Sequence, residues 1–211
     1  MEFVIATQNK GKLAEMRRIL EPLGHTVISA KEAGFTQDVA ETGTTFAENA
    51  ALKATAVAQA VGKPVIADDS GLMVDALDGA PGVYSARYAG EGATDRQRWE
   101  KLLRELEGVP KEKRTAKFCC AIVLVLPGQQ PVTFYGECPG YIGPAPLGED
   151  GFGYDPVFYL NETTSFATLS GAEKDKISHR GKAMAQLEQY LKNLPKTETK
   201  SNPGGKDGTD Q

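Results

Sequence analysis

The sequence has few of the residues that build disulfide frameworks, zinc sites or nucleophilic triads. Its 211 residues include three cysteines, two histidines and one tryptophan. Cys119 and Cys120 are neighbours and Cys138 stands apart, so neither a disulfide framework nor a zinc spacing emerges. His25 and His179 do not form a convincing Ser/His/Asp or Cys/His arrangement. We therefore expect reduced, structural thiols, and chemistry that depends on other residue types.

The sequence also lacks long hydrophobic runs and an excess of positive charge. No apolar run is long enough for a membrane span, and the N-terminus lacks the order of charged, apolar and small residues found in a signal peptide. The formal net charge of -4 argues against a broad nucleic-acid surface, although it leaves room for a local basic pocket. We expect a cytoplasmic protein that binds a small molecule, and no nucleic acid or membrane.

The stretch 64–72 is predicted to organise the chain. A short apolar run behind Pro64 indicates a buried strand, which is expected to end at Asp68, Asp69, Ser70 and Gly71. Adjacent carboxylates at the end of a buried strand repel each other and lose hydration, so a fold that keeps both usually offsets that cost with a cation or a reaction. The alternative is a polar turn in which one aspartate caps the next segment.

The N-terminal segment predicts a second polar junction. An apolar strand at residues 3–6 is followed by a polar loop with Lys10 and Lys12, and then by a helix with Leu13, Met16 and Leu20 on one face. Free backbone N–H groups and the positive end of the helix dipole would attract an anion there. The glycine spacing is not that of a Walker A loop. A plain strand-to-helix turn with surface lysines is the alternative.

The remaining elements predict an α/β fold with a mixed sheet. A strand at residues 26–30 precedes an acidic loop and a helix opened by a Thr45/Glu48 capping box. A second capping box at Thr94 and Gln97 opens a further helix. Residues 115–126 and 132–137 form a hairpin around a Pro/Gly turn, so part of the sheet is antiparallel. Single residues such as Asn49, Lys53 and Arg87 remain open between structural and functional roles.

Two segments near the C-terminus add aromatic and cationic groups. Phe152 lies between glycines, so its ring would either stack on a flat base or pack under its own loop. The cations of residues 170–181 are expected to precede the last helix, where they oppose the helix dipole. Either Glu173 and Asp175 or an anionic ligand neutralises them, and we favour the ligand. Residues 195–211 have no apolar anchor and are expected to form a disordered tail.

The sequence thus combines acids at one strand end, a lysine loop at another strand-to-helix junction, an aromatic between glycines and a cationic helix start. Together these features indicate a nucleotide polyphosphate site. Six ordered motifs carry a resemblance to the non-canonical purine nucleoside triphosphate pyrophosphatases, also called inosine triphosphatases or XTP/dITP diphosphatases. The motifs are TQNKGK from Thr7, ETGTTFAENA from Glu41, ADDSGL from Ala67, GAPGVYSAR from Gly79, GFGYDP from Gly151 and ISHR from Ile177.

The resemblance covers residues 3–194 and implies an elongated mixed sheet flanked by helices, with two lobes around a central cleft. It implies one domain over residues 1–194, with residues 195–211 outside it, and a second copy of the chain as partner in a homodimer. It also implies Mg²⁺-dependent conversion of ITP, dITP and XTP to the monophosphate and pyrophosphate, which removes deaminated purines from the nucleotide pool.

Matched by position, the resemblance implies roles for individual residues. Asp69 would be the general base and a metal ligand, and Glu41 a second metal ligand. Asp68 would share the metal or assist the water. The substrate-binding residues would be Thr7, Gln8, Asn9, Lys10, Gly11, Lys12, Ser70, Phe152, Gly153, Tyr154, Asp155, Lys174, His179 and Arg180. A phosphatase that releases orthophosphate from the γ position and a non-catalytic nucleotide sensor are the alternatives.

Overall fold

The computed structural model describes residues 1–194, and the predicted tail at 195–211 lies outside them. The described chain alternates strands and helices in its first half and forms antiparallel strands in its second. The strands are β1 (Glu2–Ile5), β2 (Thr26–Ser29), β3 (Val65–Val74), β4 (Thr115–Val125), β5 (Val132–Ile142), β6 (Phe158–Asn161) and β7 (Thr164–Ser165). The helices are α1 (Lys10–Leu20), α2 (Phe46–Val61), α3 (Asp95–Glu105), α4 (Gly171–Ile177) and α5 (His179–Lys192), with short 3-10 turns between them.

All the strands of residues 1–194 form one mixed sheet of seven, in the order β2-β1-β3-β4-β5-β6-β7. β1 pairs in parallel with β2 and β3, because helices α1 and α2 provide the crossovers that parallel pairing needs. From β3 onward every pair is antiparallel, and β4 and β5 form the predicted hairpin. The predicted α/β fold with a mixed sheet is confirmed.

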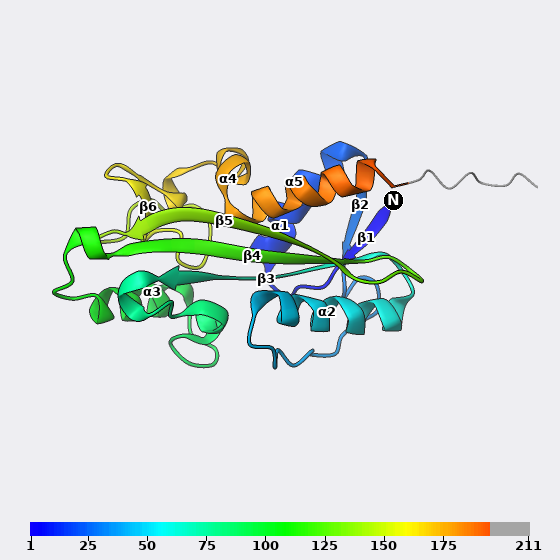
Figure 1. Cartoon of the computed structure of the whole chain (residues 1–211), viewed down its shortest axis with the longest axis horizontal. Helices are drawn as coiled ribbons and strands as arrows, with labels where there is room; N and C mark the ends of the chain where they lie inside the picture. Colours follow the sequence, from blue (N-terminus) through cyan, green and yellow to red (C-terminus); the bar gives the residue numbers. More distant parts are fainter. Residues whose placement is uncertain (195–211) are drawn as a thin grey trace, which may run out of the picture.

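The body is elongated, and the long strands β4 and β5 run along it (Figure 1). Helices α1 and α5 lie on one side of the sheet and α2 and α3 on the other. Met16, Leu20 and Leu187 belong to a core cluster between the sheet and the α1/α5 layer, whereas Ala54 belongs to a cluster under α2. A further cluster includes Leu102 of α3. The first two clusters lie on opposite faces of one half of the sheet and the third lies in the other half, and these two halves are the two lobes of the molecule.

The strand expected to end at the acids continues through them. β3 runs without interruption from Val65 to Val74, so Asp68 and Asp69 lie in its middle. The predicted strand end, and the polar turn offered as its alternative, are both wrong. Successive side chains of a strand point to opposite faces, so the two carboxylates lie on different sides of the sheet. The strand can therefore hold both acids without placing them against each other.

The cationic segment before the predicted last helix is itself helical. α4 and α5 are separated only at Ser178, whose hydroxyl accepts a hydrogen bond from Gly181 N and caps α5. A Cβ on Gly181 would lie 1.7 Å from the carbonyl oxygen of Asp175, so the two helices meet too closely for any other residue there. This tight joint orients Lys174 and Arg180 from two different helices.

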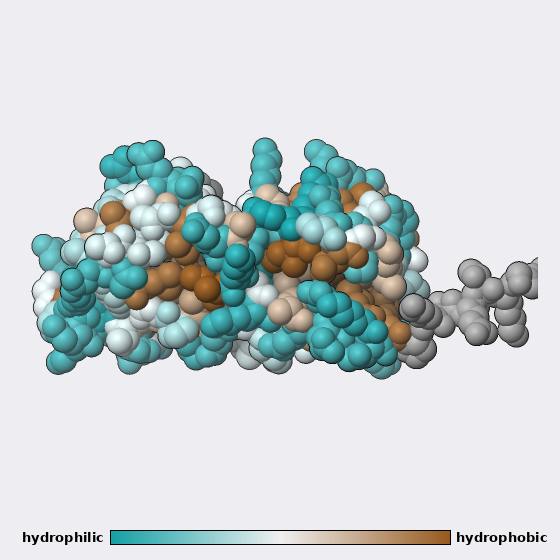
Figure 2. Space-filling model, turned by 90° about the horizontal axis from the view of Figure 1, so that it is seen from above, coloured by the Kyte–Doolittle hydropathy of each residue, from teal (hydrophilic) through white to brown (hydrophobic). Residues whose placement is uncertain are grey.

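Within residues 1–194 the three cysteines are buried, and the helices are too short or too polar to cross a membrane. Cys119, Cys120 and Cys138 are buried and unoxidised, and burial raises the pKa of Cys120 to about 12, which agrees with structural thiols. No helix within residues 1–194 combines the length and apolar character of a bilayer span. Hydrophilic side chains cover most of the upper face, with smaller hydrophobic areas between them (Figure 2).

Candidate active site

A cavity of about 1180 Å³ opens beside the middle of β3 and is lined by residues of both lobes. It gathers the predicted metal ligands and nearly all the predicted substrate-binding residues. The predicted residues that line it are Glu41, Asp69, Thr7, Gln8, Asn9, Lys10, Lys12, Ser70, Phe152, Gly153, Tyr154, Asp155, Lys174, His179 and Arg180. Gly11 is the predicted site residue that does not line it.

Asp69 faces the cavity from the α2 side of the sheet. Asn49 of α2 donates to Asp69 Oδ2 at 3.1 Å, and the backbone N–H of Ser70 donates to Oδ1 at 3.0 Å. Lys53, also on α2, lies with Nζ 2.5 Å from Glu41 Oε1 and 3.8 Å from Asp69 Oδ1. Burial raises the pKa of Asp69 above its usual value, although Lys53 and Lys12 oppose the shift. Asn49 and Lys53, left open by the sequence, thus hold the carboxylate that the motif singles out.

Asp68 faces the opposite side of the sheet and does not line the cavity. Its Oδ2 accepts from Arg180 Nη2 at 2.9 Å and lies 3.1 Å from Lys12 Nζ. Burial alone would raise the pKa of Asp68, but Lys12 and Arg180 outweigh it and hold the pKa well below the usual range. We therefore assign Asp68 to anchoring two cations instead of the metal or water role that the resemblance left open.

The loop before α1 differs from the prediction in one respect. Asn9 caps the helix, and its Oδ1 accepts from the backbone N–H groups of Gly11 at 2.9 Å and Lys12 at 3.1 Å. These N–H groups are therefore not free for an anion, because the cap side chain already satisfies them. Lys10 still lines the cavity beside the positive end of the helix dipole. Charge, more than open N–H groups, remains to attract phosphate.

Lys174 and Arg180 are almost fully buried, with exposed fractions of 4% and 1%. Lys174 Nζ lies 2.5 Å from Asp155 Oδ2 and 2.9 Å from Glu15 Oε1. Arg180 pairs with Glu15 as well as with Asp68. The ligand that we favoured is not what neutralises these cations here, and the acids that do so are not the alternative pair of Glu173 and Asp175. Buried charges need such partners in the absence of any ligand.

Glu15 is the residue that sequence reasoning missed. It is buried on α1, and although burial would raise its pKa, Arg180 and Lys174 keep the pKa below the usual value. In the sequence Glu15 precedes Met16 and is typical of the solvent-exposed face of a helix. Its partners Lys174 and Arg180 lie 159 and 165 positions away in the chain. A signal was present in the form of an acid adjoining the apolar stripe of α1, but one sequence gives no reason to prefer burial over solvation there.

Phe152 fully matches neither of the two predicted alternatives, which were a ring free to stack on a base and a ring packed under its own loop. Its ring lies 4.7 Å from Lys174 Nζ, and a Cβ on Gly11 would come within 2.4 Å of the ring. The aromatic ring thus lines the cavity while packing on the first turn of α1.

The ring of His179 stacks on Phe118 with 4.7 Å between the ring centres. Burial together with Arg180 and Lys174 lowers the pKa of His179 well below the usual value. His179 is therefore a neutral, flat group at this end.

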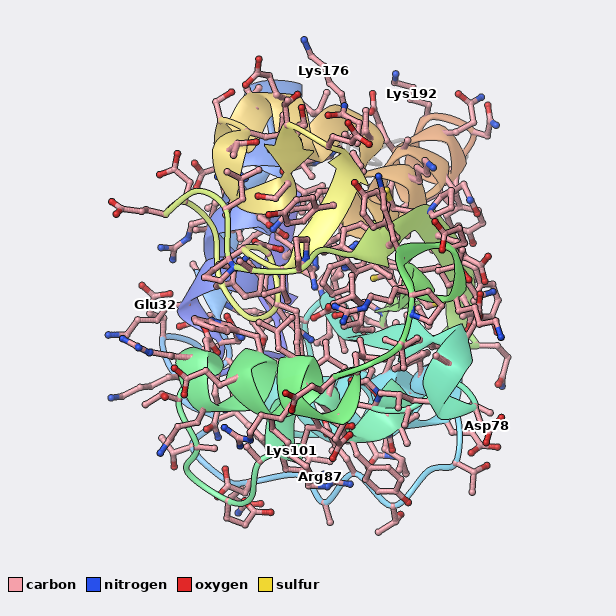
Figure 3. All side chains as sticks on the ribbon, turned by 90° about the vertical axis from the view of Figure 1, so that its left-hand side faces the viewer. Glu32, Asp78, Arg87, Lys101, Lys176 and Lys192 are labelled. Atoms are coloured by element: carbon pink, nitrogen blue, oxygen red, sulfur yellow. The ribbon has the colours of Figure 1, made fainter. Side chains whose placement is uncertain are left out.

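Arg87, left open between a phosphate and a carboxylate partner, lines the cavity. Its guanidinium lies 5.1 Å from the ring centre of Tyr84, and within residues 1–194 it forms no ion pair. Its labelled side chain lies at the lower rim of the molecule in Figure 3. A carboxylate clasp is thereby excluded, and the phosphate alternative stays a prediction.

Fold and site together define an α/β protein with a polar cavity that is lined by acids, lysines, aromatic rings and buried cations. The sequence matches the model of the Ham1 family over residues 3–190, and the chain belongs to that family.

Named relatives agree with this assignment over most of their length. The chain is 53% identical over 191 residues to the dITP/XTP pyrophosphatase of Bacillus subtilis (strain 168), covering 90% of this chain and 96% of that protein. It is 44% identical to the Ham1 protein of Staphylococcus aureus, with a TM-score of 0.80 and coverage of 91% and 98%. A HAM1 protein from Coxiella burnetii is also 44% identical, with a TM-score of 0.82 and coverage of 92% and 100%. The predicted family, and with it the hydrolase class, is confirmed.

Proposed function

We propose that the chain is a Mg²⁺-dependent pyrophosphohydrolase that converts dITP, XTP and ITP to the monophosphate and pyrophosphate. The relatives named as dITP/XTP pyrophosphatases support the first two substrates. ITP follows because it shares the hypoxanthine base with dITP. Removal of deaminated purine nucleotides would be the cellular role, in the cytoplasm.

The observation that carries the proposal is the position of Asp69. Its carboxylate lines the same cavity as Lys10, Lys12 and Phe152, and Asn49 holds it there. A nucleoside triphosphate bound in this cavity with its purine beside Phe152 would present its α-phosphate to Asp69. Attack of water on the α-phosphate releases pyrophosphate. A γ-phosphatase would instead need its general base and attacking water beside the γ-phosphate.

Each group of the chain has a task in this reaction. Asn49 fixes one carboxylate oxygen of Asp69, which leaves the other directed toward Lys53 and the cavity. The raised pKa of Asp69, caused by burial, makes its carboxylate a better proton acceptor for the attacking water. Lys10 and Lys12 line the cavity and would stabilise the negative charge that gathers on the departing pyrophosphate. Ser70 also lines the cavity, and its hydroxyl donates to Asp68 Oδ2 at 3.2 Å.

The residues fit a magnesium ion held together with substrate. Glu41 and Asp69 converge on one position that already holds a positive charge, the ammonium of Lys53. Within residues 1–194 no cluster of three or more His, Cys, Asp or Glu side chains forms. Magnesium commonly takes only one or two carboxylates and completes its shell with waters and phosphates, so two acids suffice. When bound, the ion would neutralise phosphate charge.

The Asp69→Asn variant tests the assignment. The amide keeps the shape but loses the proton acceptor and a ligand charge, so pyrophosphate release from dITP should fall by a factor on the order of 100 or more while nucleotide still binds. Asp75→Asn is the matched control, because Asp75 directly follows β3 and is exposed outside the cavity. Wild-type turnover by Asp69→Asn would refute the role.

The identity of the product separates the proposal from its alternatives. Pyrophosphate and orthophosphate are assayed separately with Mg²⁺ and dITP, XTP, ITP, GTP or ATP. Orthophosphate as the first product would indicate the γ-phosphatase, and tight nucleotide binding with negligible turnover would indicate a sensor. We also propose that the chain acts as a homodimer, and its mass in solution by light scattering tests this point.

A further inference from the structure

Two ion pairs join helices α1 and α4, and each helix contributes the acid to one pair and the base to the other. Glu15 and Arg18 are three residues apart on α1, so they share one face of that helix. On α4, Lys174 and Asp175 are adjacent. Glu15 pairs with Lys174, and Arg18 pairs with Asp175. An acid and a base on one helix therefore face a base and an acid on the other.

The Arg18 and Asp175 contact has the geometry of a fork. Arg18 Nε donates to Asp175 Oδ2 at 2.5 Å, and Nη2 donates to Oδ1 at 2.9 Å. A Cβ on Gly171, the first residue of α4, would lie 2.7 Å from the guanidinium carbon of Arg18. The guanidinium thus lies across the first turn of α4 as well as on Asp175. A two-point contact of this kind fixes direction as well as distance.

Hydrophobic burial contributes little to the placement of α4. Within this helix of seven residues only Lys174 is buried, and Ile177, its largest apolar side chain, is 37% exposed. Lys176 points away from the body toward solvent in Figure 3. The register of α4 against α1 therefore depends on polar contacts, in addition to the tight joint between α4 and α5 at Gly181. Of the four residues in these two ion pairs, only Lys174 lines the cavity.

We propose that Arg18 and Asp175 are positioning residues that set the register of α4 and so hold Lys174 in the base-reading end of the cavity. Neither residue lines the cavity, and both act through Lys174. The inference rests on the proposed function, because it takes Lys174 to face a 6-oxo purine. Loss of the clasp lets α4 shift, so Lys174 no longer presents its ammonium at a fixed point and discrimination against 6-amino purines weakens.

The test compares nucleotide selectivity in Arg18→Gln, Asp175→Asn and the double variant. We expect kcat/KM for dITP to fall about tenfold, mainly through KM, because a charged hydrogen bond to the base is misplaced. The value for dATP should change far less, so the ratio between the two narrows. The double variant should lose no more than either single one, because both remove the same contact. Arg18→Lys should restore only part of the selectivity, since an ammonium lacks the fork.

Arg17→Gln is the matched control. Arg17 is the neighbouring residue on α1 and pairs with Glu32 at 3.0 Å, and Glu32 lies at the margin of the molecule in Figure 3. Unfolding temperatures of all variants are measured alongside, and small, similar shifts are expected because both pairs are partly exposed.

Three results would overturn the inference or its basis. If Arg18→Gln and Asp175→Asn keep the selectivity of Arg17→Gln, the clasp does not position Lys174. If dITP and dATP lose activity equally, in step with the unfolding temperature, the clasp is structural only. If the wild-type chain releases no pyrophosphate from dITP, the proposed function itself fails, and the selectivity measurements are not needed to show it.

Discussion

Lys174 and Arg180 carry their charge in a place that water hardly reaches. Glu15, Asp155 and Asp68 neutralise them, so the pocket is built before any nucleotide arrives. A fixed cationic donor favours the 6-oxo group of hypoxanthine and xanthine, and it opposes the 6-amino group of adenine because two donors then face each other. Guanine shares the 6-oxo group, so its exclusion requires a separate contact with the 2-amino group.

Replacement of Lys174 by Gln should narrow the preference for ITP over ATP. The amide removes the fixed ammonium while keeping a polar side chain near Asp155 and Glu15, so kcat/KM should fall more for ITP than for ATP. Steady-state kinetics with both nucleotides measure the ratio. Lys176→Gln, on the exposed side of the same helix, is the control and should leave it unchanged.

Equal losses for ITP and ATP in Lys174→Gln would mean that Lys174 holds phosphate, and base selection would move to the loop around Phe152. Arg180 is a poorer probe, because its removal leaves both Asp68 and Glu15 with a buried charge short of a partner. Such a change commonly costs about 3 to 5 kcal/mol of stability and would obscure any change in specificity.

Sequence reasoning succeeded for residues whose partners are local. The capping boxes of Thr45 with Glu48 and Thr94 with Gln97 formed as predicted, since each needs only a spacing of three. It failed for Glu15 and for the neutralisation of Lys174 and Arg180, because all of those contacts except Lys174 with Asp155 join segments more than 100 positions apart. Composition and periodicity carry no information about which acid meets which base at that separation.

At the scale of elements, the strand β3 and the joint between α4 and α5 differ from expectation for one shared reason. Polar residues in a sequence usually predict the ends of regular structure. In β3 they continue the strand because Lys12 and Arg180 on one face and Asn49 on the other supply partners. The apolar periodicities of the other long elements had no such interruption, and their types were predicted correctly.

The contact between α5 and β5 depends on the absence of a side chain at Gly136. A Cβ there would lie 1.9 Å from the carbonyl oxygen of His179 and 2.8 Å from the backbone nitrogen of Ala183. Gly136→Ala should therefore push the start of α5 away from the sheet, at a cost of about 1 to 3 kcal/mol. Because His179 and Arg180 begin that helix, KM for dITP should rise as well.

Thermal unfolding and steady-state kinetics measure the two effects of Gly136→Ala. Gly128→Ala in the hairpin turn is the control. Its φ of 73° makes alanine strained, but no atom lies within 4 Å of the added Cβ. It should lower stability by about 1 kcal/mol and leave KM unchanged. An unchanged KM in Gly136→Ala would show that α5 does not position the base-reading residues.

For the molecule as a whole, the buried ion pairs predict sensitivity to acid. Burial alone would raise the pKa values of Asp68 and Glu15, but Arg180 with Lys12 or Lys174 holds both below their usual values. A carboxyl group whose pKa is lowered by folding contributes stability above its unfolded pKa of about 4, and this contribution is lost as pH falls through the folded pKa. Asp69 and Asp155, whose pKa values are raised by burial, offset part of the loss.

The free energy of unfolding, measured with denaturant between pH 7 and pH 3, should decrease toward acid in the wild-type chain. Asp68→Asn should be less stable by about 3 to 5 kcal/mol at pH 7, because Arg180 and Lys12 lose a buried partner. Its dependence on pH should be shallower than that of the wild type, since the titrating group is gone. Parallel curves for the two proteins would contradict the assignment.

The buried network of Glu15, Lys174 and Arg180 bears on how readily the substrate range can be altered in the laboratory. The side chains expected to read the base also join α1, α4, α5 and β3. A library that randomises Lys174 or Arg180 in search of a variant accepting adenine would lose most members to misfolding before any catalytic screen. Selections for a new base should therefore begin from a stabilised parent, or exchange acid and base partners together.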